Sequence, residues 1–234
     1  PNHGLGHHLQ ALEDRKKGKE PDVGALVDER EQEIIDASKE LGVTDVRFFR
    51  RSDEVVIVER EIIIEIADVI GDVRPDIIIT HYPYDGVPAH KAVGQMTLWA
   101  VEASSGMRVN KPYPPHGPTQ IYYHATAGEM SVLERARMPT TLIDITDVIH
   151  QKSRAMNKIE SQFYGESSPL QRKLTHAVDV TGVAINRRVP YAEAFVPHYP
   201  QVYQSLPFSE YELEISEKSE AEKYSYMTQV LPDA

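Results

Sequence analysis

The sequence predicts an α/β domain with a mostly parallel sheet, and three observations favour it. Strand-like and helix-like segments alternate along most of the chain, which is the pattern that βαβ units produce. The run from Asp76 to Thr80 is almost continuously apolar and β-branched, as is typical of a strand covered on both faces of a parallel sheet. A loop with His81, Asp85 and His90 follows it, and open α/β sheets bind ligands where their strands end.

The first predicted elements are a helix, a short strand and a second helix. Residues 26–41 have apolar side chains at helical spacing with charged side chains between them, and Gly42 supplies the stop. Residues 46–49 are expected to form a short strand. Residues 55–72 could begin as a strand, but their isoleucines repeat at helical spacing. We therefore interpret this segment as a helix, although β-branched residues have weak helix propensity.

The predicted strand at residues 76–80 is followed by a third helix. Pro88 suits the first turn of a helix, and the pattern continues to about Ser104. Trp99 stands in the middle of this helix and is expected to lie in the core. Residues 106–118 contain four prolines and are expected to form a loop.

Two more strands, a helix and an acidic end complete the prediction. We expect strands at residues 120–124 and 140–145 and a helix at residues 147–163, with at least three of the four predicted strands in one sheet. The acidic end of the chain is interpreted as an exposed helix or a mobile tail. The chain is thus divided into a single domain, residues 1–208, and an acidic carboxy-terminal tail, residues 209–234.

Composition limits the classes of function. A chain of 234 residues with 41% hydrophobic content can bury one sizeable core. The absence of cysteine excludes disulfides, thiolate zinc sites and cysteine nucleophiles, and it fits the cytoplasmic location that we expect. We see neither an apolar run that could span a membrane nor a signal peptide. The net charge of −11 argues against nucleic-acid binding. We expect a small-molecule substrate and leave a homo-oligomer open.

The loop after the apolar strand contains potential metal ligands. Imidazole and carboxylate groups commonly bind catalytic zinc, which needs three protein ligands and a water. His90 falls in the first turn of the helix that Pro88 begins, so its ring can point back toward the strand ends. Asp85 could orient a histidine or contact substrate. The alternative is structural: His81 caps the strand and Asp85 forms a turn with Gly86.

Other histidines also have two interpretations. The histidines near the start, His3, His7 and His8, could bind metal loosely or belong to the remnant of a flexible loop. His124 ends a predicted strand, so its ring points either to the rim of the site or to solvent.

Several motifs occur in a fixed order between about residue 26 and residue 195. They are Arg30-Glu-Gln-Glu33 with Leu41-Gly-Val43, Arg47-Phe-Phe49 with Asp53, the loop from Pro75-Asp76 through Thr80-His81 to Asp85 and His90, Ile143-Asp-Ile-Thr-Asp-Val148 with Lys152, Ala155 and Ser161-Gln162, and Tyr191-Ala-Glu-Ala-Phe195. Together they resemble the LmbE/PIG-L family of zinc-dependent deacetylases. The central loop of that family reads approximately Pro-Asp-x-x-x-Thr-His, followed by Asp-x-His-x-Asp-His.

The resemblance implies a Rossmann-like three-layer domain that removes an N-acyl group, usually acetyl, from an amino sugar. It implies one zinc ion with His90 as a ligand, and a catalytic role for Asp85 and His81. Arg30 and Asp53 would lie near the substrate, although Arg30 can also form an ordinary i,i+3 ion pair on its helix. In this chemistry zinc polarises the carbonyl and activates a water, and a carboxylate takes the proton.

The chain departs from the family pattern in two places. The family's amino-terminal Ala-His-Pro-Asp-Asp motif is absent, so the other zinc ligands and the base would come from a segment before Pro1. Within the loop, Val87 replaces a histidine that stabilises the tetrahedral intermediate, and Ala89 removes a carboxylate. We therefore expect the 234-residue chain to bind zinc weakly or not at all and to show little hydrolytic activity. Even with the missing motif restored, we expect slow action on simple N-acetyl sugars.

Two alternatives to the deacetylase remain open. Some relatives on the same fold hydrate an unsaturated oxo-dicarboxylic acid at the same metal, so the chain could be a lyase. A metal-free homologue could instead act as a binding or scaffold subunit. Metal analysis would separate the third possibility from the first two, and substrate assays would separate those two from each other.

Overall fold

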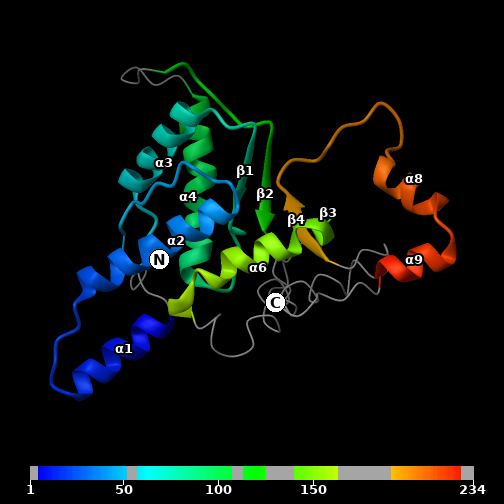
Figure 1. Cartoon of the computed structure of the whole chain (residues 1–234). Coiled ribbons are helices and arrows are strands. Elements are labelled where there is room, and N and C mark those ends of the chain that lie inside the picture. The colour runs from blue at the N-terminus through cyan, green and yellow to red at the C-terminus, as the bar shows by residue number, and fades with distance from the viewer. Residues whose placement is uncertain (1–4, 52–56, 107–112, 125–139, 163–190, 228–234) are drawn as a thin grey trace.

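A four-stranded sheet with helices on both of its faces forms the centre of the molecule (Figure 1). The computed structural model describes residues 5–51, 57–106, 113–124, 140–162 and 191–227. In chain order the described elements are α1 (Leu5–Lys16), α2 (Val23–Glu40), α3 (Arg60–Val73), β1 (Ile77–Thr80), α4 (Pro88–Ser105), β2 (Gln120–His124), β3 (Thr141–Asp144), the 3-10 helix η1 (Thr146–Val148), α6 (Ile149–Asn157), the 3-10 helix η2 (Glu160–Gln162), β4 (Ala192–Pro197), α8 (Glu210–Glu217) and α9 (Glu220–Met227). None of the described helices is both long and apolar enough to cross a membrane.

The sheet is mixed, and the prediction of a mostly parallel sheet was wrong. Its strand order is β1-β2-β4-β3. Strands β1 and β2 are parallel, with Ile78 opposite Ile121, whereas β4 runs antiparallel to both β2 and β3. The error arose because β4 was not recognised as a strand. Its segment follows a long stretch without clear periodicity, and its partners are remote in the sequence. Three of the four predicted strands do lie together in this sheet, as expected.

Strand β1 lies at an edge of the described sheet, which contradicts its predicted position as a covered inner strand. The side chains of Ile77 and Ile79 are 56% and 60% exposed on one face. On the other face Ile78 packs against the core, and the Thr80 hydroxyl donates a hydrogen bond to the Thr97 hydroxyl oxygen of α4 (3.2 Å). The run of isoleucines therefore reflects strand propensity, which does not depend on both faces being covered.

The segment at residues 46–49, predicted as a strand, forms none. Its Arg47 instead makes ion pairs with Asp45 (2.7 Å) and with Asp72 of α3 (2.9 Å). Both phenylalanines of the segment remain partly exposed. A hydrogen bond between charged side chains connects this segment to α3. The segment pairs with no strand among the described residues.

The helices follow local signals more closely. Helix α2 matches the predicted helix at residues 26–41 but starts earlier, because the Asp22 carboxylate accepts a hydrogen bond from the Ala25 amide (3.0 Å). It stops before Gly42, whose φ of +77° suits glycine. Helices α3 and α4 were also predicted. The predicted helix at residues 147–163 is divided into η1, α6 and η2, and α1 was not predicted.

Helices α3 and α4 pack together over one face of β1 and β2 (Figure 1). The main buried cluster draws its residues from α3, α4, β2 and β4 and includes Ala67, Ile70, Ala100, Val101, Ile121, Tyr123, Ala194 and Val196. Trp99 was predicted to lie in this core but is 62% exposed. The buried positions of α4 include 96, 97, 100, 101 and 104, and Trp99 lies outside that stripe.

Helix α6 contacts the opposite face of the sheet. Along β4, Ala192 and Ala194 point to the main cluster, so Glu193 between them points to the other face. There its carboxylate accepts a hydrogen bond from the Lys152 ammonium of α6 (2.6 Å). Helix α6 also packs against α2, so the two helices form a layer on this side.

A buried polar network joins α2 to η2. The Glu33 carboxylate accepts hydrogen bonds from the Ser161 amide (2.7 Å), the Ser161 hydroxyl (2.6 Å) and the Arg30 guanidinium (3.0 Å). Burial opposes ionisation of Glu33, but the hydrogen bonds from Ser161 and Arg30, together with the Arg30 charge, outweigh it and lower its pKa.

We expect Glu33→Ala to destabilise the fold by about 2–4 kcal/mol at pH 7, because it leaves buried donors of Arg30 and Ser161 without an acceptor. The pKa of Glu33 is lower in the folded chain, so its contribution to stability is complete above the unfolded pKa of about 4.3 and is lost as the pH falls through the folded value. Urea unfolding of wild type and variant between pH 3 and pH 7 measures this difference. Removing the exposed Asp36 is the control and should change stability little.

Candidate metal centre

The site is built on a loop that leaves β1 and lies against the first turns of α4. The contact occurs at Gly94, where a Cβ atom would lie 2.5 Å from the His81 carbonyl oxygen and 3.1 Å from the Pro83 nitrogen. Real side chains do not approach a backbone so closely, so this position requires glycine. The Gln95 amide also donates a hydrogen bond to the Pro83 carbonyl oxygen (3.3 Å). Helix α4 therefore sets the path of the loop through both contacts.

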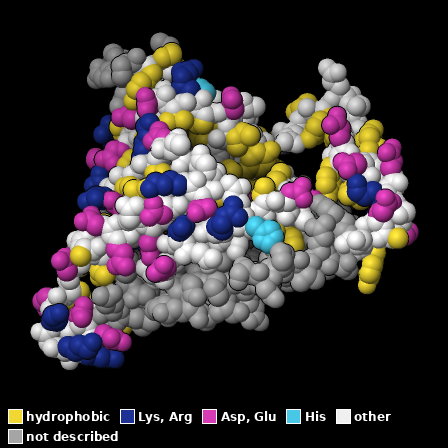
Figure 2. All heavy atoms as spheres, in the orientation of Figure 1, with side chains coloured by type: hydrophobic (Ala, Val, Ile, Leu, Met, Phe, Trp, Pro, Cys, Tyr) yellow, Lys and Arg dark blue, Asp and Glu magenta, His cyan; other side chains and the backbone are white. Residues whose placement is uncertain are grey.

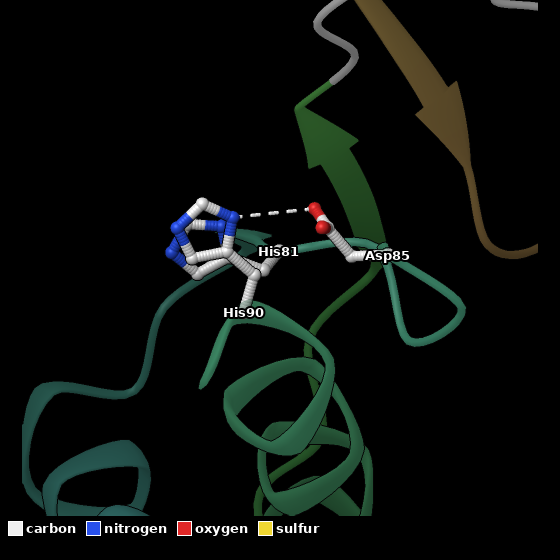
Figure 3. Close-up of side chains that lie close together, drawn as sticks. All are labelled: His81, Asp85 and His90. Atoms are coloured by element: carbon white, nitrogen blue, oxygen red, sulfur yellow. Dashed lines mark hydrogen bonds and ion pairs between the residues drawn. The ribbon is translucent and has the colours of Figure 1, made fainter. Parts of the chain in front are cut away.

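Three side chains of this loop and helix converge at the carboxyl end of β1 (Figure 3). The imidazole rings of His81 and His90 are stacked, with their centroids 4.2 Å apart and an angle of 11° between their planes. One donor atom from each of His81, Asp85 and His90 lies within 4.8 Å of the other two. The expectation that Asp85 and His90 lie at the end of the apolar strand is thus confirmed, whereas their chemical roles remain predictions.

Asp85 is the buried member of the group, with only 7% of its surface exposed. Its Oδ1 atom accepts a hydrogen bond from the Val87 amide (2.7 Å), which closes the turn that the sequence suggested. Its Oδ2 atom lies 3.3 Å from Nδ1 of His90, and Figure 3 shows the carboxylate at one edge of the ring. A carboxylate on Nδ1 orients the imidazole and leaves Nε2 as the nitrogen for a metal or a substrate.

The donor set suits a metal ion. Imidazole is a common zinc ligand, so the two rings are the potential ligands, while the Asp85 carboxylate is engaged by the Val87 amide and orients His90. His81 is exposed and His90 is about one-third exposed, so an ion could reach the rings from solvent. Asp85 therefore forms a turn, as the structural interpretation of the loop predicted, and it also positions a potential metal ligand.

The structure places the other candidate residues elsewhere. Arg30 donates hydrogen bonds to Glu33 and, at 3.4 Å, to the Ser161 hydroxyl, so its described contacts are those of the buried network. Asp53 lies outside the described residues, as does His3. His124 is exposed at the end of β2, and its ring contacts Phe195. The proposed substrate roles of Arg30 and Asp53 remain predictions.

Sequence reasoning missed one residue of the site, Gly94. A glycine inside a helical pattern reduces helix stability, and it usually marks a close approach of another part of the chain. That signal was present in the sequence, but it does not identify the backbone that approaches. The partner became evident only when α4 and the loop were placed together.

The fold and the loop define an LmbE-like α/β protein with a mixed sheet. Residues 7–101 match the family model described as GlcNAc-PI de-N-acetylase, PIG-L. The chain is 31% identical over 148 residues to "Probable N-acetyl-alpha-D-glucosaminyl L-malate deacetylase 2" of Bacillus subtilis (strain 168). This match covers 62% of the chain and 62% of that relative's length. Residues 7–101 therefore resemble the PIG-L/LmbE family of deacetylases, the family that the motifs predicted.

Three solved structures share the fold. The 4-carboxy-2-hydroxymuconate hydratase of Pseudomonas putida is 21% identical, with a TM-score of 0.69 over 88% of this chain and 85% of the other. A conserved protein of Thermus thermophilus is 21% identical, with a TM-score of 0.63 over 88% and 92%. The N,N'-diacetylchitobiose deacetylase of Pyrococcus horikoshii is 19% identical, with a TM-score of 0.62 over 83% and 78%. At these identities the likeness concerns the fold.

The contact at Gly94 predicts an unusual response to substitution. A glycine-to-alanine change inside a helix normally stabilises it by about 1 kcal/mol. Here the new methyl group meets the loop backbone, so we expect Gly94→Ala to destabilise the protein by about 1–3 kcal/mol and to weaken metal binding. Thermal unfolding with and without zinc measures both effects. Gly86→Ala is the matched control, because a Cβ there has open space and should be tolerated. A stabilised Gly94→Ala protein would contradict the packing described.

Proposed function

We propose that this chain is part of a zinc-dependent hydrolase that removes an N-acyl group from an amino-sugar-like substrate. The carrying observation is the group of His81, Asp85 and His90 at the carboxyl end of β1, inside a domain that resembles the PIG-L/LmbE family. The relative from Bacillus subtilis and the structure from Pyrococcus horikoshii are both named as deacetylases of N-acetylated sugar compounds. The proposed substrate class rests on these two names, and the proposed metal rests on the group of His81, Asp85 and His90.

The proposed roles follow from the contacts of each side chain. Asp85 accepts the Nδ1 proton of His90, which holds the ring in one tautomer and directs Nε2 outward as a metal ligand. His81 lies over that ring and is exposed, so it can bind the same ion or donate a hydrogen bond to the substrate carbonyl. A bound zinc ion would supply Lewis-acid polarisation of the carbonyl and a water of lowered pKa.

The residue at position 87 favours a second candidate function. Val87 has no hydrogen-bond donor in its side chain, and the loss of one oxyanion donor typically costs about 3–4 kcal/mol of transition-state stabilisation. Hydration of an unsaturated oxo-dicarboxylic acid forms an enolate, whose oxygen lies elsewhere than that of a tetrahedral intermediate, and a hydratase has the same fold. This lyase activity is therefore the alternative proposal.

Metal binding can be tested separately from activity. We expect zinc titrated into the wild-type chain in a calorimeter to bind, Asp85→Asn to lower the affinity about 10–100-fold and His90→Ala to abolish binding. Asp85→Asn keeps the shape of the side chain but lacks the charge that fixes the Nδ1 proton. His150→Ala, an exposed histidine of α6, is the control and should bind like wild type. Equal affinity for His90→Ala and wild type would refute the assignment of His90 as a ligand.

The reaction class is decided by product analysis of the zinc-loaded protein. With an N-acetyl amino sugar, release of free amine that disappears in His90→Ala supports the deacetylase. With an unsaturated oxo-diacid, loss of the absorbance of the conjugated double bond supports the lyase. We expect the first reaction, at a rate limited by the missing donor at Val87. If the zinc-loaded protein catalyses neither reaction, both proposed activities are wrong.

A further inference from the structure

A cavity lies beside the same loop, and none of the three candidate ligands lines it. Its volume is about 400 Å³, which falls in the range of small-molecule sites. Its walls come from α4, from the loop at Tyr82 to Tyr84, from β2 and from the residues after β4. His81, Asp85 and His90 are not among its lining residues. The cavity is therefore a separate site, although it shares the loop with the candidate metal centre.

One face of α4 lines this cavity. Gln95, Leu98, Trp99 and Glu102 follow one another at spacings of i, i+3, i+4 and i+7, so they lie on the same side of the helix. This is the side that leaves Trp99 exposed, contrary to its predicted place in the core. Apolar side chains are drawn in yellow in Figure 2, and some of them remain uncovered on the surface of the molecule. A tryptophan with open surface in the wall of a cavity offers a flat apolar face to a ligand.

Aromatic rings in edge-to-face contact form much of the remaining wall. The ring centroids of Tyr84 and Tyr82 are 5.7 Å apart, those of Tyr82 and Tyr123 are 5.4 Å apart, those of Tyr123 and His198 are 5.7 Å apart, and those of His198 and Tyr199 are 4.5 Å apart. A hydrogen bond between the Tyr123 hydroxyl and Nδ1 of His198 fixes the middle of this series. Each ring is held by its neighbours, so a ligand would bind to a wall that is already ordered.

The polar groups of the cavity indicate the charge of its ligand. Glu102 is an acid, and the lining contains neither lysine nor arginine among the residues that the structure describes. The Glu102 carboxylate and the chain's net charge of −11 would repel an anion, and the lining supplies no lysine or arginine among the described residues to compensate. The Glu102 carboxylate can accept hydrogen bonds from a ligand. The Gln95 side-chain oxygen can do so too, because the amide nitrogen of Gln95 already donates a hydrogen bond to the Pro83 carbonyl oxygen. Acceptors beside a flat apolar face suit a ring that has hydroxyl groups.

We propose that this cavity binds an uncharged, hydroxylated ring, a pyranose sugar, with one face of the ring against Trp99 and its hydroxyl groups on Glu102 and Gln95. The inference goes beyond the proposed function, because no candidate metal ligand takes part. Tyr82 and Tyr84 belong to the loop that also bears His81 and Asp85, so the cavity and the metal centre share this loop. The cavity then acts as a second sugar site for a substrate that is longer than one ring.

The single tryptophan of the chain makes the proposal directly measurable. Titration with N-acetyl-D-glucosamine is expected to change the fluorescence of Trp99 in a saturable way. In calorimetry, Trp99→Ala should abolish this binding and Glu102→Gln should weaken it about tenfold, the loss expected for a hydrogen bond to a charged group. Phe208→Ala removes an exposed aromatic ring outside the cavity and is the matched control, which should bind like wild type.

Other outcomes would overturn the proposal. A larger response to tetramethylammonium than to the sugar would show a site for cations, and a response that depends on protein concentration would show a surface covered by a second copy. The His90→Ala variant separates this site from the metal centre, because sugar binding should persist there. Its loss in that variant would place the sugar at the metal centre instead. A saturable response without any deacetylation would support the cavity and refute the proposed function.

Discussion

The contact between the loop after β1 and Gly94 of α4 is the constraint on which both sites depend. A helix and a backbone can approach this closely only where the helix has no side chain. The contact involves the carbonyl of His81 and the nitrogen of Pro83, the backbone positions on either side of Tyr82. His81 then lies over His90, while its neighbour Tyr82 points into the main cluster.

The loop therefore presents different chemistry on its two sides. On one side Asp85 is buried, bonded to the Val87 amide and placed against His90. On the other side Tyr82 and Tyr84 face an aromatic cavity to which Glu102 contributes a carboxylate. A turn at Pro83 and Tyr84, closed by a hydrogen bond from the Asp85 amide to the Tyr82 carbonyl oxygen (3.0 Å), separates the two sides. A short segment can thus serve a metal centre and a neighbouring ligand site at once.

The residues of the loop were predictable from sequence because their signals are local. A β-branched run indicates the strand, Pro88 indicates the start of the helix, and polar side chains between them indicate a site. The end of α2 was similarly indicated by Gly42, whose backbone needs a positive φ. Residues 46–49 show the limit of such reasoning. Their aromatic and β-branched side chains have strand propensity, but in the described residues the segment lies outside the sheet and pairs with Asp72 of α3.

The sequence by itself indicated the resemblance to the PIG-L/LmbE family, most helices, three of the strands and the convergence of His90 with Asp85, because helix stops, strand runs and motif order are encoded by near neighbours. Only the tertiary structure decided that the sheet is mixed, that β1 lies at its edge and that Trp99 faces a cavity. Those features depend on which segments meet across long stretches of chain, as β2 and β4 do. Periodicity shows that a side chain has an apolar neighbour, but it cannot show which surface that neighbour belongs to.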